Sequence, residues 1–153
     1  VSGTGSIAFG RGCDKEFARC GGWVEFFGDE GSCYWIGRQG MSLFSKEADG
    51  RLPRGPLYEL VHGEFGLTED YQLLIGLSGN LPLSGKVAGF QRYVLQAARA
   101  GDTAAAALYE TAALELALMI RTLKQTSFLR RAHQRFLLRR YLPCRRIHPG
   151  PSP

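Results

Sequence analysis

A run of alanine and leucine at residues 103–125 constrains the fold of this chain more than any other segment. The run is apolar on nearly every face of a helix, and such a helix is stable in water when other elements cover it. Gly101 ends the helical segment before it, and Asp102 is a good N-cap residue. We therefore expect a helix buried between other elements. The uninterrupted apolar stretches fall far short of the roughly 20 residues that a membrane helix needs.

Short strands are expected before the first helix. Residues 5–11 and 19–27 are half-apolar runs on either side of a polar turn at 12–18, which predicts a β-hairpin. The following stretch, CYWIGRQGMSLFSKEA, comes after acidic residues that favour the positive end of a helix dipole. It predicts a helix, in which Gly37 and Gly40 cost about 1 kcal/mol each unless another element packs closely against them.

Three further helices are expected between the hairpin segment and residue 103. Residues 56–65 predict one, and residues 69–77 predict another that Thr68 would cap. Residues 86–100 predict the third, whose apolar face carries Val87, Phe90, Val94 and Ala98.

Charge divides the chain into two parts. Residues 1–125 hold 12 Lys+Arg and all 14 Asp+Glu, a net charge of −2, whereas residues 126–153 hold seven Arg and no acid. The body thus gives no electrostatic reason to expect nucleic acid or an anionic membrane. The tail has only Phe128, Phe136 and Tyr141 as stacking rings, so specific RNA binding is not expected there either. The abrupt change after residue 125 is typical of a shifted reading frame, and a genuine basic extension is the alternative.

The cysteines and the N-terminus indicate the compartment. Cys13, Cys20, Cys33 and Cys144 show no CxxC pair and no Cys/His ligand spacing, so we expect no metal site. No export signal precedes them, which predicts reduced thiols and a cytoplasmic protein. A disulfide between Cys13 and Cys20 is geometrically possible across the hairpin. Val1 stands where a native chain has Met, which predicts a fragment.

Two glycine-rich clusters could carry chemistry. The Gly3-Thr4-Gly5-Ser6 turn has the composition of a phosphate cradle, because its backbone N–H groups and two hydroxyls can donate to an anion. An ordinary turn is the alternative, and no Gly-Lys-Ser/Thr follows to make it a Walker loop.

The second cluster combines Gly21-Gly22-Trp23 with Gly28-Asp29-Glu30-Gly31-Ser32. A ligand can lie against glycine backbone and an indole ring, while an ionised Asp29 accepts hydrogen bonds from sugar-type hydroxyls. In the purely structural interpretation, Asp29 caps a helix and Trp23 belongs to the core. His62 has no partner nearby in sequence and is interpreted as a surface residue of its helix.

Taken together, SGTGS, GGW, GDEGSxYWIG and AARAGD closely resemble the N-acetylglucosamine kinases and their BadF/BadG/BcrA/BcrD ATPase relatives. The resemblance covers roughly residues 1–125, and residues 126–153 are then an Arg/Pro-rich tail outside the family pattern. It implies an α/β chain: a fragment of an actin-like (ribonuclease H-like) ATPase fold, with an N-terminal β-hairpin followed mainly by helices.

The resemblance also implies an activity, namely phosphorylation of an amino sugar by ATP with Mg²⁺, and a homodimer is considered. Gly3, Thr4, Gly5 and Ser6 would contact the nucleotide phosphates, and Gly22, Trp23 and Asp29 would line the amino-sugar site. Val24 departs from the glycine that often follows the tryptophan, which leaves the sugar specificity open.

The family's catalytic base, first phosphate hairpin and adenosine segment match no residues of this chain, so we expect it to be inactive alone. Two other classes stay open. One is the ATPase activator of a CoA-ester reductase or dehydratase, which would hold an iron–sulfur cluster through interface cysteines. The other is a non-catalytic module that interacts through its basic tail.

Overall fold

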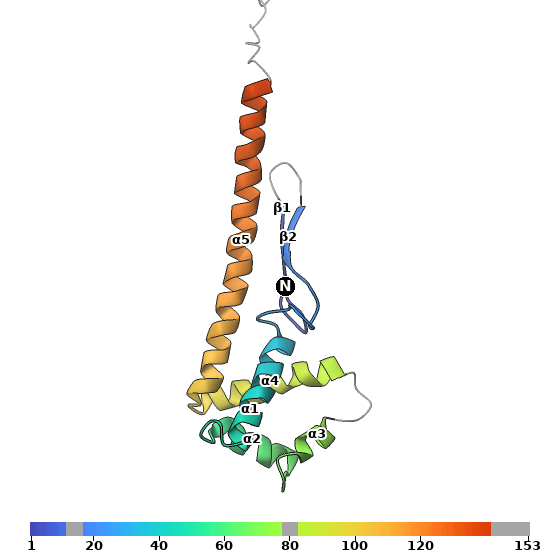
Figure 1. Ribbon diagram of the computed structural model, residues 1–153, viewed down its shortest axis with the longest axis vertical. Helices are drawn as coiled ribbons and strands as arrows, with labels where there is room; N and C mark the ends of the chain where they lie inside the picture. Colours follow the sequence, from blue (N-terminus) through green and yellow to red (C-terminus); the bar gives the residue numbers. More distant parts are fainter. Residues whose placement is uncertain (12–16, 78–82, 142–153) are drawn as a thin grey trace, which may run out of the picture.

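The computed structural model describes residues 1–11, 17–77 and 83–141, and it describes side chains as far as residue 126. One hairpin and five helices make up this part of the chain: β1 (Ile7–Arg11), β2 (Phe17–Gly21), α1 (Cys33–Ala48), α2 (Pro56–Phe65), α3 (Gln72–Gly76), α4 (Leu83–Arg99) and α5 (Thr103–Tyr141). Helices α1 to α4 gather at one end, while α5 extends away from them with the hairpin beside it (Figure 1). The α/β class and the order of a hairpin followed by helices are as expected.

The predicted hairpin is confirmed, but its second strand is shorter than expected. The strands pair antiparallel, with Ile7 opposite Gly21 and Arg11 opposite Phe17. β2 ends at Gly21 rather than at residue 27, because Gly21 and Gly22 take left-handed φ angles of 78° and 71° that turn the chain out of the sheet. Most of the predicted turn, including Cys13, lies outside the described residues.

Helix α1 covers the expected residues, and its two glycines have a packing reason. A Cβ atom at Gly37 would collide with the backbone carbonyl of Val87, and one at Gly40 would collide with the side chain of Val94. Both neighbours belong to α4, so the glycines let α1 and α4 approach closely. The cost in helix propensity is thereby offset by packing.

The core lies among α1, α2 and α4, with α5 closing one side. Its most deeply buried side chains, exposed by 3% or less, include Phe44, Leu57, Val61, Phe90 and Val94. The predicted apolar face of residues 86–100 is confirmed, since Val87, Phe90 and Val94 are all buried and Ala98 packs against the core. Helix α2 begins and ends as predicted.

The expected helix at residues 69–77 is only partly present. α3 covers Gln72–Gly76, and its N-cap residue is Tyr71, which makes no side-chain capping bond. Thr68 does not cap it. Instead, the Thr68 backbone N–H and hydroxyl both donate to the Gln72 side-chain oxygen, at 2.8 and 3.2 Å. The Gln72 and Leu73 N–H groups donate to the carbonyls of Glu69 and Asp70, at 3.0 and 3.2 Å, so the start of the predicted helix forms tighter i→i+3 turns.

Helix α5 begins as predicted but is not buried. The Asp102 carboxylate accepts the Ala105 backbone N–H at 2.9 Å, which confirms the N-cap. Its second oxygen accepts the Leu57 N–H at 3.0 Å, so one side chain also satisfies the start of α2. The expectation of a helix covered on all sides is wrong for the described chain, since Leu114 is 72% exposed and Ile120 is 63% exposed. The hairpin covers one side of α5 (Figure 1).

One segment also corrects the sequence-based view of apolar length. Thr103–Thr126 is long and apolar enough to cross a membrane by length and composition, and 17% of its apolar window is buried. That is weak evidence taken alone, because core helices pass the same test.

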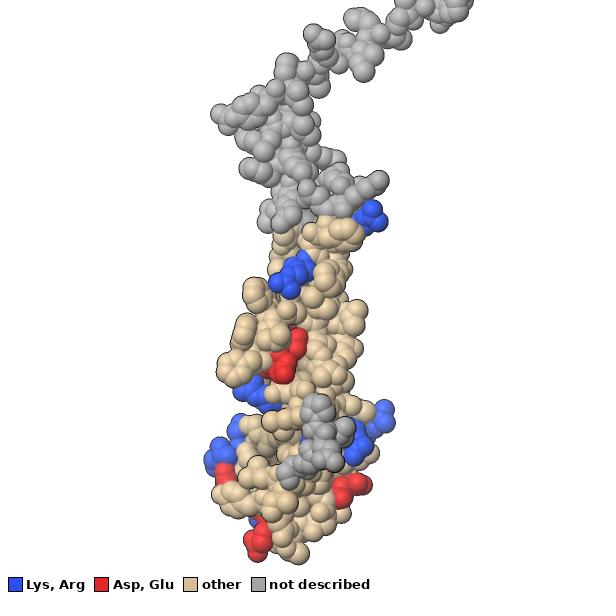
Figure 2. Space-filling model, turned by 90° about the vertical axis from the view of Figure 1, so that its right-hand side faces the viewer, with Lys and Arg blue, Asp and Glu red and all other residues tan. Residues whose placement is uncertain are grey.

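Acidic and basic side chains are interspersed on the face shown in Figure 2 rather than gathered by sign.

Candidate functional site

Ser6 joins the two glycine-rich clusters into one site. Its backbone N–H donates to Asp29 Oδ1 at 3.0 Å, its hydroxyl donates to the Glu30 carbonyl at 2.8 Å, and its carbonyl accepts the Gly22 N–H at 3.0 Å. The Ser6 side chain is 2% exposed. Its hydroxyl therefore has an internal partner, and the turn is fixed against the loop that follows the hairpin.

Asp29 is held in place by its backbone and by its carboxylate. Its φ of 58° is left-handed, a conformation that Asp tolerates better than most residues. The residue is 8% exposed, and its carboxylate lies so close to Gly5 that a Cβ atom there would stand 2.8 Å from Oδ2. Gly5 thus leaves room for the carboxylate, which faces the phosphate-type turn.

Helix α1 is capped by residues other than the predicted acids. The Ser32 hydroxyl accepts the Trp35 N–H at 3.1 Å, and the helix has no acidic residue in its first turn. The Cys33 and Tyr34 N–H groups donate to the carbonyls of Gly3 and Thr4, at 2.8 and 3.3 Å. The interpretation of Asp29 as the helix cap is therefore wrong, because Ser32 and the turn carbonyls already satisfy those N–H groups.

The donors left in the turn fit a phosphate. Within the described part of the chain, the Thr4 N–H, the Thr4 hydroxyl and the Gly5 N–H have no hydrogen-bond partner, and Thr4 is exposed. Since the Gly3 and Thr4 carbonyls bond the start of α1, these N–H groups are the turn's remaining polar groups. Successive unpaired N–H groups are the donor set that binds an anion. Among the side chains that the structure describes, no group of three His, Cys, Asp or Glu could hold a metal ion.

Trp23 is an exposed ring beside this site, not a core residue. It is 57% exposed, and Gly28, the neighbour of Asp29, lies so close that a Cβ there would stand 2.8 Å from Trp23 Cβ. The Arg19 guanidinium carbon lies 5.4 Å from the Trp23 ring centroid. The structural alternative that buried this ring is wrong, since the exposed indole contacts only Arg19 and, with ring centroids 6.5 Å apart, Phe27 among the described side chains.

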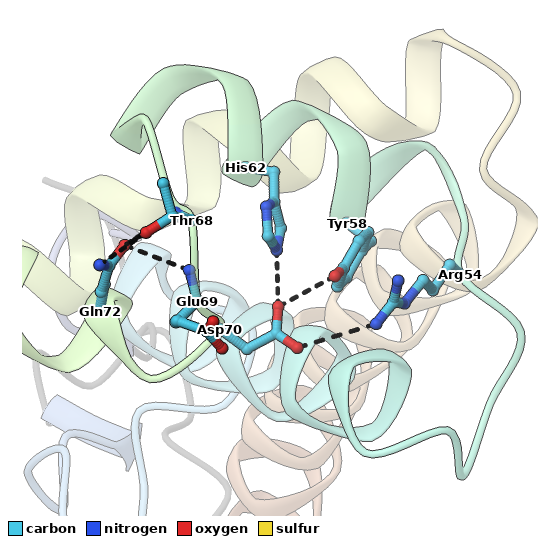
Figure 3. Close-up of polar contacts among 7 residues, drawn as sticks. All are labelled: Arg54, Tyr58, His62, Thr68, Glu69, Asp70 and Gln72. Carbon is cyan, nitrogen blue, oxygen red and sulfur yellow. Dashed lines mark hydrogen bonds and ion pairs between the residues drawn. The ribbon is translucent and has the colours of Figure 1, made fainter.

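A second polar cluster surrounds Asp70 and was not predicted. His62 Nε2 lies 2.6 Å from Asp70 Oδ1, the Tyr58 hydroxyl donates to the same oxygen at 3.0 Å, and Arg54 lies 3.8 Å from Oδ2 (Figure 3). The sequence-based view of His62 as a partnerless surface residue is wrong. Its partner comes from the segment after α2, eight residues away, and no local motif signals that contact.

The Asp70 cluster, made of Arg54, Tyr58, His62 and Asp70, stabilises the fold through its internal hydrogen bonds and ion pairs. The His62 hydrogen bond lowers the pKa of Asp70, with further lowering by Tyr58 and Arg54 and an opposing effect of burial. Burial and the Asp70 hydrogen bond raise the pKa of the Tyr58 hydroxyl. The group lines an open depression of about 440 Å³, but its charged groups already bond one another. It ties α2 to the segment before α3.

Among the described residues, Glu47 carries the one buried side-chain oxygen that has no hydrogen-bond partner. Its Oε1 accepts the Gly55 N–H at 3.1 Å, whereas its buried Oε2 has no partner. Burial raises the pKa of Glu47, and the neighbouring Asp102 carboxylate raises it further. Glu47 and Asp102 both serve the start of α2, at the opposite end of α1 from the Ser6 site.

The structure describes two of the four cysteines. Cys20 and Cys33 are free and partly buried, while Cys13 and Cys144 lie outside the described residues. The possible Cys13–Cys20 disulfide therefore stays untested.

Comparison with known proteins identifies the family. The pattern of the BadF/BadG/BcrA/BcrD ATPase family matches residues 1–138, which is most of the chain. The chain therefore belongs to this ATPase family, whose members use ATP.

The chain is similar to a sugar kinase and to a candidate sugar kinase of known structure. An N-acetylmuramic acid/N-acetylglucosamine kinase from Clostridium acetobutylicum is 32% identical over 125 residues, which span 79% of this chain and 40% of that enzyme. A crystal structure of a candidate N-acetylglucosamine kinase from Chromobacterium violaceum matches with a TM-score of 0.70 and 32% identity, over 80% of this chain and 41% of that one. The chain thus spans about two fifths of each relative, and its described fold matches that part of a sugar kinase of the actin-like ATPase fold.

Proposed function

We propose that the protein containing this chain transfers the γ-phosphoryl group of ATP to a hydroxyl of an amino sugar of the N-acetylglucosamine or glucosamine class. The observation that carries the proposal is the set of hydrogen bonds from Ser6 to Gly22, Asp29 and Glu30, which we call the Ser6 junction. It holds a turn with unpaired N–H donors against the fixed Asp29 carboxylate. Gly3, Thr4, Gly5 and Ser6 form the phosphate turn in this proposal. Gly22, Trp23 and Asp29 form part of the sugar pocket.

The geometry suits a reaction that depends on positioning. Phosphoryl transfer requires little covalent chemistry from the protein, and most of the rate comes from holding the phosphates and the attacking hydroxyl in place. Thr4 and Gly5 supply donors for phosphate oxygens, and Mg²⁺ on ATP neutralises the remaining charge. Asp29 accepts hydrogen bonds from sugar hydroxyls, and the exposed Trp23 ring offers an apolar surface to the sugar ring.

The isolated 153-residue chain has no kinase activity in this proposal. The catalytic base, the first phosphate hairpin and the adenosine segment of the resembled kinases match none of its residues. Residues 1–125 form part of the kinase domain in this proposal, and because the family pattern continues to residue 138, only residues 139–153 of the expected tail stand outside it. We also propose a cytoplasmic location and self-association as a homodimer.

A segment exchange tests the proposal. The stretch of the Clostridium kinase that aligns with this chain is replaced by the corresponding residues from 1–125, and ADP release is measured with and without N-acetylglucosamine. We expect sugar-dependent ADP release that falls when Asp29→Asn is introduced. Folded chimeras without sugar-dependent turnover, or with turnover indifferent to Asp29→Asn, would contradict the assigned pocket.

The same assay separates the kinase from the activator alternative. An activator hydrolyses ATP without a sugar acceptor, so ADP release that is unchanged by any amino sugar would favour it. Loss of ATPase activity on replacing Cys20 or Cys33 by Ser would strengthen that outcome.

A further inference from the structure

One side of α5 packs against the hairpin and the loop that follows it. Its side chains follow one another at spacings of four, three and four residues: Ala112, Leu116, Met119 and Leu123. Ala112 and Met119 are buried, Leu116 and Leu123 are half-buried, and the residues between them are mostly exposed. We call these four residues the inner stripe. The hairpin lies beside α5 in Figure 1.

Two glycines next to the proposed sugar pocket contact the inner stripe. A Cβ atom at Gly31 would stand 2.7 Å from the Ala112 carbonyl oxygen and 2.6 Å from Leu116 Cγ. A Cβ atom at Gly21 would stand 2.5 Å from Met119 Sδ. The first glycine lies in the loop of the proposed sugar-binding carboxylate, and the second ends β2 directly before the tryptophan segment. One helix therefore touches both halves of the pocket.

Met119 packs against the Ser6 junction. The same Cβ atom at Gly21 would lie 3.3 Å from the Ser6 carbonyl oxygen, which accepts the Gly22 N–H at 3.0 Å. Ser6 also donates its N–H to Asp29. The Met119 thioether and the Ser6 carbonyl thus approach Gly21 from the same side. The Met119 side chain is 8% exposed, so it fills interior space at this point.

We propose that Met119 is a positioning residue of the sugar pocket, which holds Gly22 and Trp23 where they and Asp29 reach the same sugar ring. The proposal rests on the proposed function, and Met119 itself does not touch the sugar. Because protein interiors are close-packed, a shorter side chain at this position leaves a cavity into which the neighbouring segment can move. A displacement of about 1 Å at a group that holds the substrate is enough to weaken its contribution severely.

Leu123 provides the matched control, because it makes the same kind of contact away from the pocket. A Cβ atom at Gly10 would stand 3.0 Å from Leu123 Cδ2. Gly10 is paired with Ala18, which lies three positions along β2 from Gly21, or about 10 Å. Met119→Ala and Leu123→Ala each shorten a side chain of the inner stripe that meets a hairpin glycine, and only the first lies at the pocket.

Amide hydrogen exchange of the full 153-residue chain measures the positioning without any ligand. Each rate is taken relative to that of the Val94 amide in the core, which reports a loss of stability of the whole chain. Met119→Ala should speed exchange of the Ser6 and Gly22 N–H groups by about tenfold or more, because the segment they hold is released. Leu123→Ala should leave both rates within about threefold of the parent values.

Sugar affinity measures what the positioning does. Titration of the same chain with N-acetylglucosamine, followed at the Trp23 indole, should give a Kd about tenfold higher for Met119→Ala. Leu123→Ala should stay within about threefold of the parent, and so should Met119→Leu, which conserves the volume of the side chain. If either alanine variant does not fold, Met119→Val and Leu123→Val replace the pair, because they remove less volume.

Two results would overturn the proposal. One is exchange at Ser6 and Gly22 that responds equally to the Met119 and Leu123 variants. The other is a parent chain that binds N-acetylglucosamine with a Kd that Met119→Ala leaves unchanged. A parent chain that binds no sugar would contradict the proposed function instead, and the exchange rates would still decide whether Met119 positions the segment.

Discussion

Asp29→Ala tests whether the carboxylate holds the phosphate-type turn in place. The substitution leaves the buried Ser6 N–H, which now donates to Asp29 Oδ1 at 3.0 Å, without an acceptor. An unsatisfied buried donor costs about 1–3 kcal/mol. Alanine at the left-handed φ of 58° costs about 1 kcal/mol more than Asp, which tolerates that region. The free energy of unfolding should therefore fall by about 2–4 kcal/mol.

Thermal unfolding followed by circular dichroism measures that loss. For a chain of this size each 1 kcal/mol lowers Tm by about 2–4 °C, so Asp29→Ala should lower Tm by roughly 5–15 °C. Asp29→Asn keeps an acceptor oxygen and the tolerance for left-handed φ, so it should stay within about 1 kcal/mol of the parent. Asp29→Gly relieves the backbone but not the donor, and should fall between them. Equal Tm values for the Ala and Asn variants would refute the role given to the Ser6 hydrogen bond.

Three other carboxylates, at positions 102, 47 and 70, give predictions for stability. Asp102→Ala removes the carboxylate that accepts N–H groups at the starts of both α2 and α5, and should lower the free energy of unfolding in urea by about 2–4 kcal/mol. Ser32→Ala removes a single capping hydrogen bond and should lower it by about 1 kcal/mol. Equal losses would refute the role of Asp102 at two helices. Because the pKa of Glu47 is raised, the folded chain holds this proton more tightly than the unfolded chain. The stability that the protonated side chain contributes is therefore lost as pH rises above about 4.5. Glu47→Gln should therefore be more stable than the parent at pH 7, an advantage that should vanish in acid; a constant difference from pH 4 to 7 would exclude this. The lowered pKa of Asp70 means that its stabilisation is present above about pH 4 and is lost as pH falls through the folded-state pKa. Asp70→Asn should cost about 1 kcal/mol at pH 7 and less in acid, which urea titrations at several pH values would check.

Local signals in the sequence were sufficient for the elements that local contacts define. Helix α1, helix α2 and the Asp102 cap depend on residues within a few positions of one another, and all three are confirmed. The expectation that another element packs closely against Gly37 and Gly40 also came from local sequence, and the structure shows that this element is α4.

Contacts between distant segments could not be predicted. The Ser6 junction joins residues 23 positions apart, and Ser32 rather than Asp29 caps α1 because the Asp29 carboxylate is turned toward Ser6. His62 meets Asp70 only because the chain reverses after α2. The composition of α5 predicted burial, but burial depends on which elements lie beside a helix, and the hairpin covers only one side.

The central claim is that the Ser6 junction brings a sugar pocket and a phosphate turn together. Amide chemical shifts of the ¹⁵N-labelled chain during titration with N-acetylglucosamine test it most directly. The account predicts saturable shifts at the Asp29 amide and the Trp23 indole, reduced by Asp29→Asn, and shifts at Thr4 and Gly5 when ATP and Mg²⁺ are added. Saturable shifts confined to other parts of the chain, or none at these four residues, would contradict it.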